Sequence, residues 1–217
     1  MRAFVSWSGG KDSSLSLYRI VQDRSAEITY FLNMTSEDGR RGRSHGINSV
    51  LLEKQAAAAG VRLLSRGCSW PTYEEEFKKS LLFLKGKKVK TGVFGDIDTQ
   101  EHRDWVERVC RETGIVPILP LWKEERNVLM EEFLDAGFKA VVVSVRSDVL
   151  GEDWLGRIID KKFVEDVRAL GNVDICGENG EYHTFVFDGP IFKKPVDFST
   201  GRITLSRNRY FLELLPK

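Results

Sequence analysis

Short apolar runs alternate with amphipathic stretches over residues 1–119, and this alternation constrains the fold more than any other feature of the sequence. Runs of strand length are expected at residues 3–7, 28–34, 61–65, 89–95 and 115–119. Helical spacing fills the stretches between them, at residues 13–22, 47–59, 73–84 and 104–113. Strands separated by helices pair in parallel, because each helix carries the chain back across a face of the sheet. The pattern predicts an α/β domain with a five-stranded parallel sheet and helices on both faces.

The rhythm changes in the second half of the chain. A helix is expected at residues 124–136 and a β-branched strand at 139–145, followed by turns rich in Gly and Asp and by further short strands. We therefore predict a larger domain over residues 1–122 and a smaller α+β domain over residues 123–217. No long linker separates them, so we expect the two domains to pack on each other.

Composition excludes several classes of protein. The 33 Lys and Arg residues nearly balance the 32 Asp and Glu residues, so no broad basic surface is expected for a nucleic acid. No apolar window approaches the roughly 18 residues of a membrane span, and the chain starts with a strand pattern rather than a signal segment. We expect a cytoplasmic protein with no membrane partner. The three cysteines stand far apart, which argues against a structural metal or a disulfide framework.

A polar loop, SWSGGKDSS at residues 6–14, separates the first strand from the first helix. In an open parallel sheet, ligands bind beyond the carboxyl ends of the strands, where the next helix presents unpaired N–H groups to an anion. Gly9 and Gly10 would let the backbone curl around a phosphate, and Lys11 would add a positive charge. Hydroxyl groups could donate further hydrogen bonds, from Ser8, Ser13 and Ser14. The loop is predicted to bind phosphate.

The spacing of this loop differs from the Walker A motif and from GxGxxG. A plain glycine turn with Asp12 or Ser13 as the helix cap is the alternative, but the complete string after a first strand argues against it. SGGKDS resembles the loop of the PP-loop ATP pyrophosphatases, which split ATP into AMP and pyrophosphate by adenylating an oxygen of their substrate. The resemblance implies an ATP site that includes Ser8, Gly9, Gly10, Lys11, Asp12 and Ser13.

Other residues are candidates for the same nucleotide site. Lys11 and a magnesium ion could offset the charge on the phosphates, and Asp12 either binds this Mg²⁺ or orders the loop. Gly95 and Asp96 follow the fourth expected strand, where the Asp96 carboxylate could contact ribose or a metal, or could simply stabilise a turn. The superfamily resemblance also implies that adenine is held near Asn33 and Met34 through backbone groups.

Three further segments resemble the diphthine–ammonia ligase family: GDIDTQEHRDWVERVC, PLW and CGENGEYHTFVFDGPIF. With the loop, the likeness covers the chain from Met1 to about Phe192. It implies a Rossmann-like, HUP-type nucleotide domain and a smaller C-terminal domain that binds the acceptor. The implied reaction is an ATP-dependent amidation with ammonium, in which an acyl-adenylate forms and AMP and pyrophosphate are released. The implied acceptor is the carboxylate of diphthine on elongation factor 2. A homodimer is possible, and the sequence does not decide the oligomeric state.

The segment Glu178–His183 is the candidate acceptor site. Such a charged turn usually faces solvent, but the resemblance makes Glu178 and Glu181 candidates for guiding or deprotonating ammonium. His183 could act as a base or contact the acceptor. His45 is either a contact to phosphate or acceptor, or a solvated loop histidine. The remaining acceptor-binding candidates are Asn179, Gly180 and Tyr182.

Asn179 and His183 depart from the pattern Glu-Gly-Gly-Glu-aromatic-Glu that is usual in the diphthine-linked members. Members with the Asn/His version resemble a sister group with a proposed role in corrinoid amidation during cobalamin salvage, so another carboxylate stays open as the acceptor. An RNA thiolase is a second alternative, although the cysteines are unpaired and the charge is balanced. A nucleotide-sensing module is a third, against which the intact Lys11 and Asp12 argue.

Overall fold

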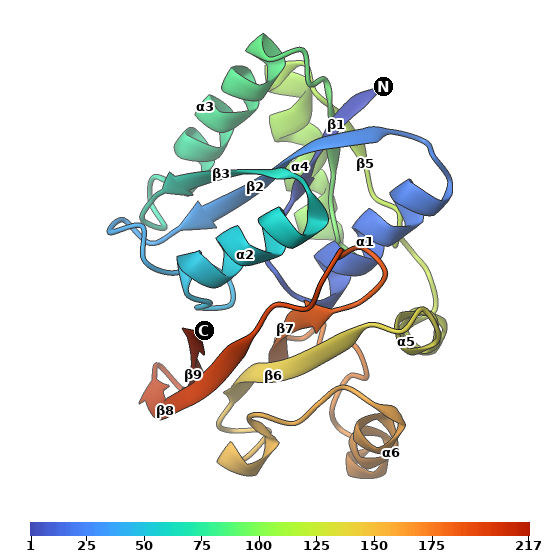
Figure 1. The fold of residues 1–217 in the computed structure, drawn as a ribbon, viewed down its shortest axis with the longest axis vertical. Coiled ribbons are helices and arrows are strands. Elements are labelled where there is room, and N and C mark those ends of the chain that lie inside the picture. The colour runs from blue at the N-terminus through green and yellow to red at the C-terminus, as the bar shows by residue number, and fades with distance from the viewer.

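The computed structural model describes residues 1–217 and contains two β-sheets with helices between and around them (Figure 1). The N-terminal sheet has five strands in the order β3-β2-β1-β4-β5. Every neighbouring pair in this sheet is parallel, which confirms the predicted architecture. The strands are β1 (Arg2–Ser6), β2 (Glu27–Thr35), β3 (Arg62–Gly67), β4 (Thr91–Val93) and β5 (Val116–Ile118).

Helices cover both faces of this sheet because side chains alternate along its strands. Ala3 and Val5 point to one face and pack with apolar residues of α1 and α2. Phe4 points to the other face and packs with apolar residues of α3 and α4. The helices are α1 (Lys11–Gln22), α2 (Ser49–Ala59), α3 (Tyr73–Gly86) and α4 (Gln100–Thr113).

The ends of these helices follow from local chemistry. The Asn48 side chain accepts the N–H of Val50 at 2.9 Å at the start of α2, and Gly60 ends that helix with a φ of 70°. Helix α1 begins differently, because Gly10 occupies its N-cap position and no side chain caps it. Neither Asp12 nor Ser13 is therefore the cap, and the N–H groups of this turn are left for other partners.

The C-terminal half forms an antiparallel sheet in the order β7-β6-β9-β8, in agreement with the predicted α+β character. The final hairpin is longer than the short strands expected there, since its two strands have nine and eight residues. The elements of this half are α5 (Arg126–Asp135), β6 (Lys139–Arg146), the short 3₁₀ helix η1 (Glu152–Trp154), α6 (Lys161–Leu170), β7 (Tyr182–Asp188), β8 (Phe198–Ser206) and β9 (Arg209–Pro216).

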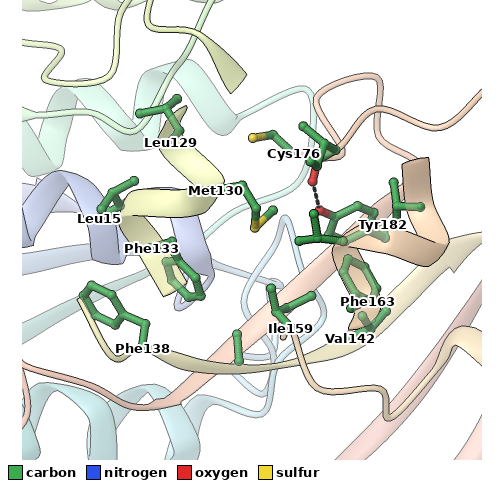
Figure 2. Close-up of a cluster of buried hydrophobic side chains, with 14 of the residues drawn as sticks. Leu15, Leu129, Met130, Phe133, Phe138, Val142, Ile159, Phe163, Cys176 and Tyr182 are labelled. Atoms are coloured by element: carbon green, nitrogen blue, oxygen red, sulfur yellow. Dashed lines mark hydrogen bonds between the residues drawn. The ribbon is translucent and has the colours of Figure 1, made fainter. Parts of the chain in front are cut away.

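The second sheet packs against α1 and α2, on the side away from the first sheet (Figure 1). Val141 and Val143 of β6 join the apolar cluster that contains residues of α1, α2 and β1. Val142 faces the opposite way, into a cluster with Phe133 of α5 and Phe163 of α6 (Figure 2). Because β6 contributes to both clusters, the two halves share one continuous interior.

The chain passes between the two halves in the segment that joins β5 to α5. Leu119 packs against the cluster under α3 and α4, whereas Leu121 is fully buried in the cluster under α5 and α6. The domain boundary at residue 122 stays a prediction. No helix of the chain has the length and apolar character that crossing a membrane requires.

Candidate active site

The loop between β1 and α1 has room only for glycine at two positions. Gly9 has a φ of +81°, and a Cβ there would lie 2.6 Å from Leu52 Cδ2. A Cβ on Gly10 would collide with the His45 ring and lie 3.1 Å from the carbonyl oxygen of Thr184. The paired glycines therefore allow α2, the segment before it and β7 to close tightly around the loop.

Strand β7 is hydrogen-bonded directly to this loop. The N–H of Lys11 donates to the Thr184 hydroxyl at 3.1 Å, and the N–H of Val186 donates to the Gly9 carbonyl at 2.9 Å. The Gln55 amide links both segments, because its Nε2 donates to the carbonyls of Gly9 at 3.0 Å and Val186 at 2.6 Å. The C-terminal domain thereby holds the conformation of the N-terminal loop.

A cleft of about 350 Å³ lies where the N-terminal and C-terminal halves of the chain meet. It opens at the carboxyl ends of β1 and β4, the edge at which open parallel sheets bind ligands. Side chains from both predicted sites line this one cleft. The lining includes Ser8, Lys11, Asp12, Ser13, Gly95, Asp96, Glu178, Gly180, Tyr182 and His183, together with Ser6, Ser44, His45, His102, Cys176, Gly177 and Thr184.

Lys11 supplies a buried positive charge to the cleft. Its Nζ lies 2.6 Å from Oδ1 of Asp12, and the residue is only 5% exposed. Burial opposes the charge, but the Asp12 carboxylate, with a smaller contribution from Glu178, holds the pKa of Lys11 above its usual value. Lys11 therefore stays an ammonium group at neutral pH, as charge compensation for a phosphate requires.

Glu178 faces Lys11 and Asp12 across the cleft. Burial, and then the Asp12 carboxylate, raise the pKa of Glu178 to about 7, while Lys11 acts in the opposite direction. This carboxyl group therefore changes its charge near neutral pH within the cleft.

Glu181 has different surroundings from those expected of an acceptor contact. It is 3% exposed and is not part of the cleft wall. Its carboxylate accepts the N–H groups of Asp174 and Asn179, both at 3.0 Å, and the Asn179 side-chain amide at 3.0 Å. These contacts give Glu181 a positioning role, because they fold the segment that carries Glu178.

His45 and His183 come from different domains and stack on each other. Their ring centroids are 4.5 Å apart and the rings are inclined by 18°. Nδ1 of His45 lies 3.0 Å from the Thr184 carbonyl oxygen. Burial lowers the pKa of His45 to about 4 and that of His183 well below its usual value. Both rings are therefore neutral at pH 7, and these contacts exclude the alternative of a solvated loop histidine at position 45.

Of the residues expected near adenine and ribose, Asp96 lines the cleft but Asn33 and Met34 do not. Asn33 and Met34 are buried at the end of β2 and do not line the cleft. The Asn33 amide donates to the Trp7 carbonyl at 2.6 Å, and its Oδ1 has no partner. Asp96 does line the cleft, and its carboxylate lies 3.4 Å from Nδ1 of His102, which raises the pKa of that histidine. The adenine and ribose assignments stay predictions.

The acids of the cleft fit a magnesium ion that arrives with a nucleotide. No group of three or more His, Cys, Asp or Glu side chains converges as a metal site. Asp12 and Asp96 both line the cleft, and Mg²⁺ typically binds one or two carboxylates together with phosphate and water oxygens. The donor set suits a shared ion rather than a permanently bound metal.

Several cleft residues are absent from the candidates that the sequence indicates: Ser44, His102, Cys176 and Thr184. Thr184 directly follows the candidate acceptor segment Glu178–His183, so extending that segment by one residue would have included it. Cys176 stays a thiol, because burial raises its pKa to about 12. His102 lies in the segment GDIDTQEHRDWVERVC that carries the family resemblance, but neither it nor Ser44 is singled out, since only the packing of their segments brings them to the cleft.

Comparison with known families accounts for both halves of the cleft. The diphthamide synthase N-terminal domain matches residues 1–117, and the diphthamide synthase C-terminal domain matches residues 125–214. The chain belongs to the diphthamide synthase family. Within this family, the loop lies in the N-terminal domain and the segment around Glu178 in the C-terminal domain.

Curated relatives in the diphthamide synthase family are named diphthine–ammonia ligase. The Homo sapiens protein is 25% identical over 94% of this chain and 85% of its own length. The Saccharomyces cerevisiae protein is 30% identical over 89% of this chain but only 34% of its own length. Among solved structures, a protein described as a predicted subunit of tRNA methyltransferase from Methanocaldococcus jannaschii is 18% identical, with a TM-score of 0.47 over 90% of this chain and 100% of its own.

Proposed function

We propose that this member of the diphthamide synthase family is an ATP-dependent carboxylate–ammonia ligase that converts diphthine on elongation factor 2 to diphthamide. The observation that carries the proposal is a single cleft lined by the PP-loop residues Lys11 and Asp12 and by Glu178 of the C-terminal domain. The match to both diphthamide synthase domains and the names of the curated relatives support this substrate.

Adenylation is the first step of the proposed reaction. A carboxylate is a poor electrophile, so one of its oxygens attacks the α-phosphorus of ATP and pyrophosphate leaves. Lys11 and the start of α1 offset the charge on the phosphates. Asp12 and Asp96 are the residues that would hold a magnesium ion, which would supply further positive charge there. Gly9 and Gly10 let α2, His45 and β7 pack closely on the loop that carries Lys11 and Asp12.

Amidation is the second step. Ammonia attacks the carbonyl carbon of the acyl-adenylate, and AMP leaves with the electrons of the broken C–O bond. Glu178, when ionised, attracts ammonium into the cleft, and Glu181 holds the loop that carries it. Tyr182, His183 and Gly180 form the acceptor side of the wall.

The decisive experiment measures pyrophosphate release and product mass with ATP, Mg²⁺ and ammonium. Elongation factor 2 bearing diphthine should give acceptor-dependent pyrophosphate release and a mass change that corresponds to replacement of OH by NH₂. Pyrophosphate release with a corrinoid carboxylate and not with diphthine would show that the corrinoid is the acceptor. Nucleotide binding without release for any carboxylate would refute the ligase assignment and favour a sensor.

A further inference from the structure

The stacked pair of His45 and His183 has no role in adenylation, yet it lies in the wall of the cleft. A backbone carbonyl only accepts hydrogen bonds, so the contact of His45 Nδ1 with the Thr184 oxygen at 3.0 Å places the ring proton on Nδ1. Nε2 of His45 then carries the lone pair of the neutral ring. This tautomer is fixed by the fold, because Thr184 also bonds to Lys11 through its hydroxyl.

The surroundings keep this lone pair available. Burial, followed by repulsion from Lys11 and Arg209, keeps the His45 ring neutral, although the Thr184 carbonyl and Asp12 act in the opposite direction. His183 stacks on it and is also neutral. Two neutral imidazoles, each with one acceptor nitrogen, therefore lie near the Lys11 ammonium group.

His45 also borders a second cavity. A groove of about 350 Å³ between the segment before α2 and strands β8 and β9 shares Ser44 and His45 with the cleft. Its lining combines apolar side chains, among them Ile47 and Phe211, with the cationic side chains of Arg41, Arg43 and Arg202. The groove is therefore a second space beside His45 that suits a small uncharged nucleophile better than a cation.

We propose that the His45–His183 pair is the binding site for the nitrogen nucleophile and that Nε2 of His45 is its proton acceptor. The inference rests on the proposed ligase function. Ammonium first gives one proton to the ionised Glu178 carboxylate in the same cleft, which leaves ammonia with a lone pair. Ammonia then attacks the acyl carbon, and the C–O bond to AMP breaks. The surplus proton on the new amide nitrogen passes to Nε2 of His45, which returns it to water.

The variant His45→Asn tests this role directly. The Asn amide retains a donor near the position of Nδ1, so the bond to the Thr184 carbonyl is preserved, but the acceptor at Nε2 is lost. Amide formation with ammonium should fall by about 10²-fold, while acceptor-dependent pyrophosphate release in a single turnover is retained. Hydroxylamine also loses a proton as it forms the hydroxamate, so its reaction should slow by a similar factor.

Two more variants separate binding from proton transfer. His45→Gln places an amide near Nε2 that can hold ammonia but cannot take a proton, so KM for ammonium should recover while kcat stays low. His183→Phe keeps the ring stack without nitrogen atoms and should raise KM for ammonium. No loss of amide formation in His45→Asn, or an equal loss of pyrophosphate release in the same variant, would overturn the inference. Absence of pyrophosphate release in the unaltered protein would instead refute the proposed ligase function.

Discussion

At the scale of single residues, the cleft depends on groups whose charge is set by their neighbours. Lys11 is buried beside Asp12 and keeps its charge, while His45 is buried beside a carbonyl and loses its own. The sequence identified both residues, but only their contacts decide which is charged. Lys11 was predictable because its neighbours in the chain form a recognisable loop, whereas the state of His45 depends on Thr184, 139 positions away.

Lys11→Ala should weaken adenylation. The change removes the buried charge that offsets the phosphates, so the rate of pyrophosphate release should fall by about 10²- to 10³-fold. Rapid-quench measurement of pyrophosphate in the first turnover provides the test, and a rate equal to that of the parent protein would remove Lys11 from the mechanism.

Glu181→Gln should destabilise the protein and slow amidation. The carboxylate accepts three hydrogen bonds in a buried turn, and an amide can accept them only by turning an N–H toward one donor. We expect a loss of about 1–3 kcal/mol in the free energy of unfolding, measured with urea. ATP affinity should be unaffected. A stable variant with weakened ATP binding would contradict the positioning role.

At the scale of elements, strand β7 is hydrogen-bonded to the loop between β1 and α1 and holds its conformation. Its Thr184 hydroxyl occupies an N–H group in the first turn of α1, a position at which helices commonly bind anions. The sequence placed this strand only approximately, because a run of mixed polar and aromatic residues does not reveal what it pairs with. Its register against β6 and its bonds to Gly9 come from packing between domains.

Thr184→Val removes the acceptor for the Lys11 N–H while preserving the shape of the side chain. The protein without nucleotide should lose about 1–3 kcal/mol of stability, because a buried donor is left unpaired. The loss should shrink with saturating ATP if a phosphate takes the same N–H. Thr204→Val, on an exposed position of β8, is the matched control and should change stability little.

Gly10→Ala should disrupt the junction between loop and β7. The added methyl group would collide with the His45 ring and press on the Thr184 carbonyl, so both stability and amidation should fall. Gly86→Ala provides the control, because a Cβ there meets nothing within 4 Å. Thermal unfolding of the two variants is the measurement. Equal Tm values would show that the loop tolerates the extra atom.

At the scale of the whole molecule, ionisable groups in the cleft act on stability in opposite directions. Glu178 has a pKa of about 7 in the folded protein against an ordinary value of 4.5, so the folded protein binds more protons between these values. Its contribution to stability therefore falls as pH rises from about 4.5 to about 7. His45, with a pKa of about 4 against an ordinary value of 6.5, binds fewer protons when folded, so its contribution rises between those values.

Glu178→Gln should remove the part of the stability that decreases as pH rises from about 4.5 to about 7. Relative to the parent protein, the variant should be more stable at pH 7 than at pH 4.5, because the buried carboxyl group no longer ionises. Urea unfolding at several pH values gives the difference in free energy between the two proteins. A difference that does not change with pH would mean that the Glu178 carboxyl titrates as it does in the unfolded chain.

The sequence by itself determined the parallel sheet, the two glycines and the lysine of the phosphate loop, since these depend on neighbouring residues and on short-range periodicity. Tertiary structure decided that Glu181 supports a turn, that His45 and His183 stack, and that Thr184 bonds to Lys11. The physical reason is that the stack and the Thr184–Lys11 bond join segments far apart in the chain, which meet because β6 and β7 pack apolar side chains against α1 and α2. The Glu181 bonds are local, but they depend on the conformation of a turn that residue periodicity does not predict.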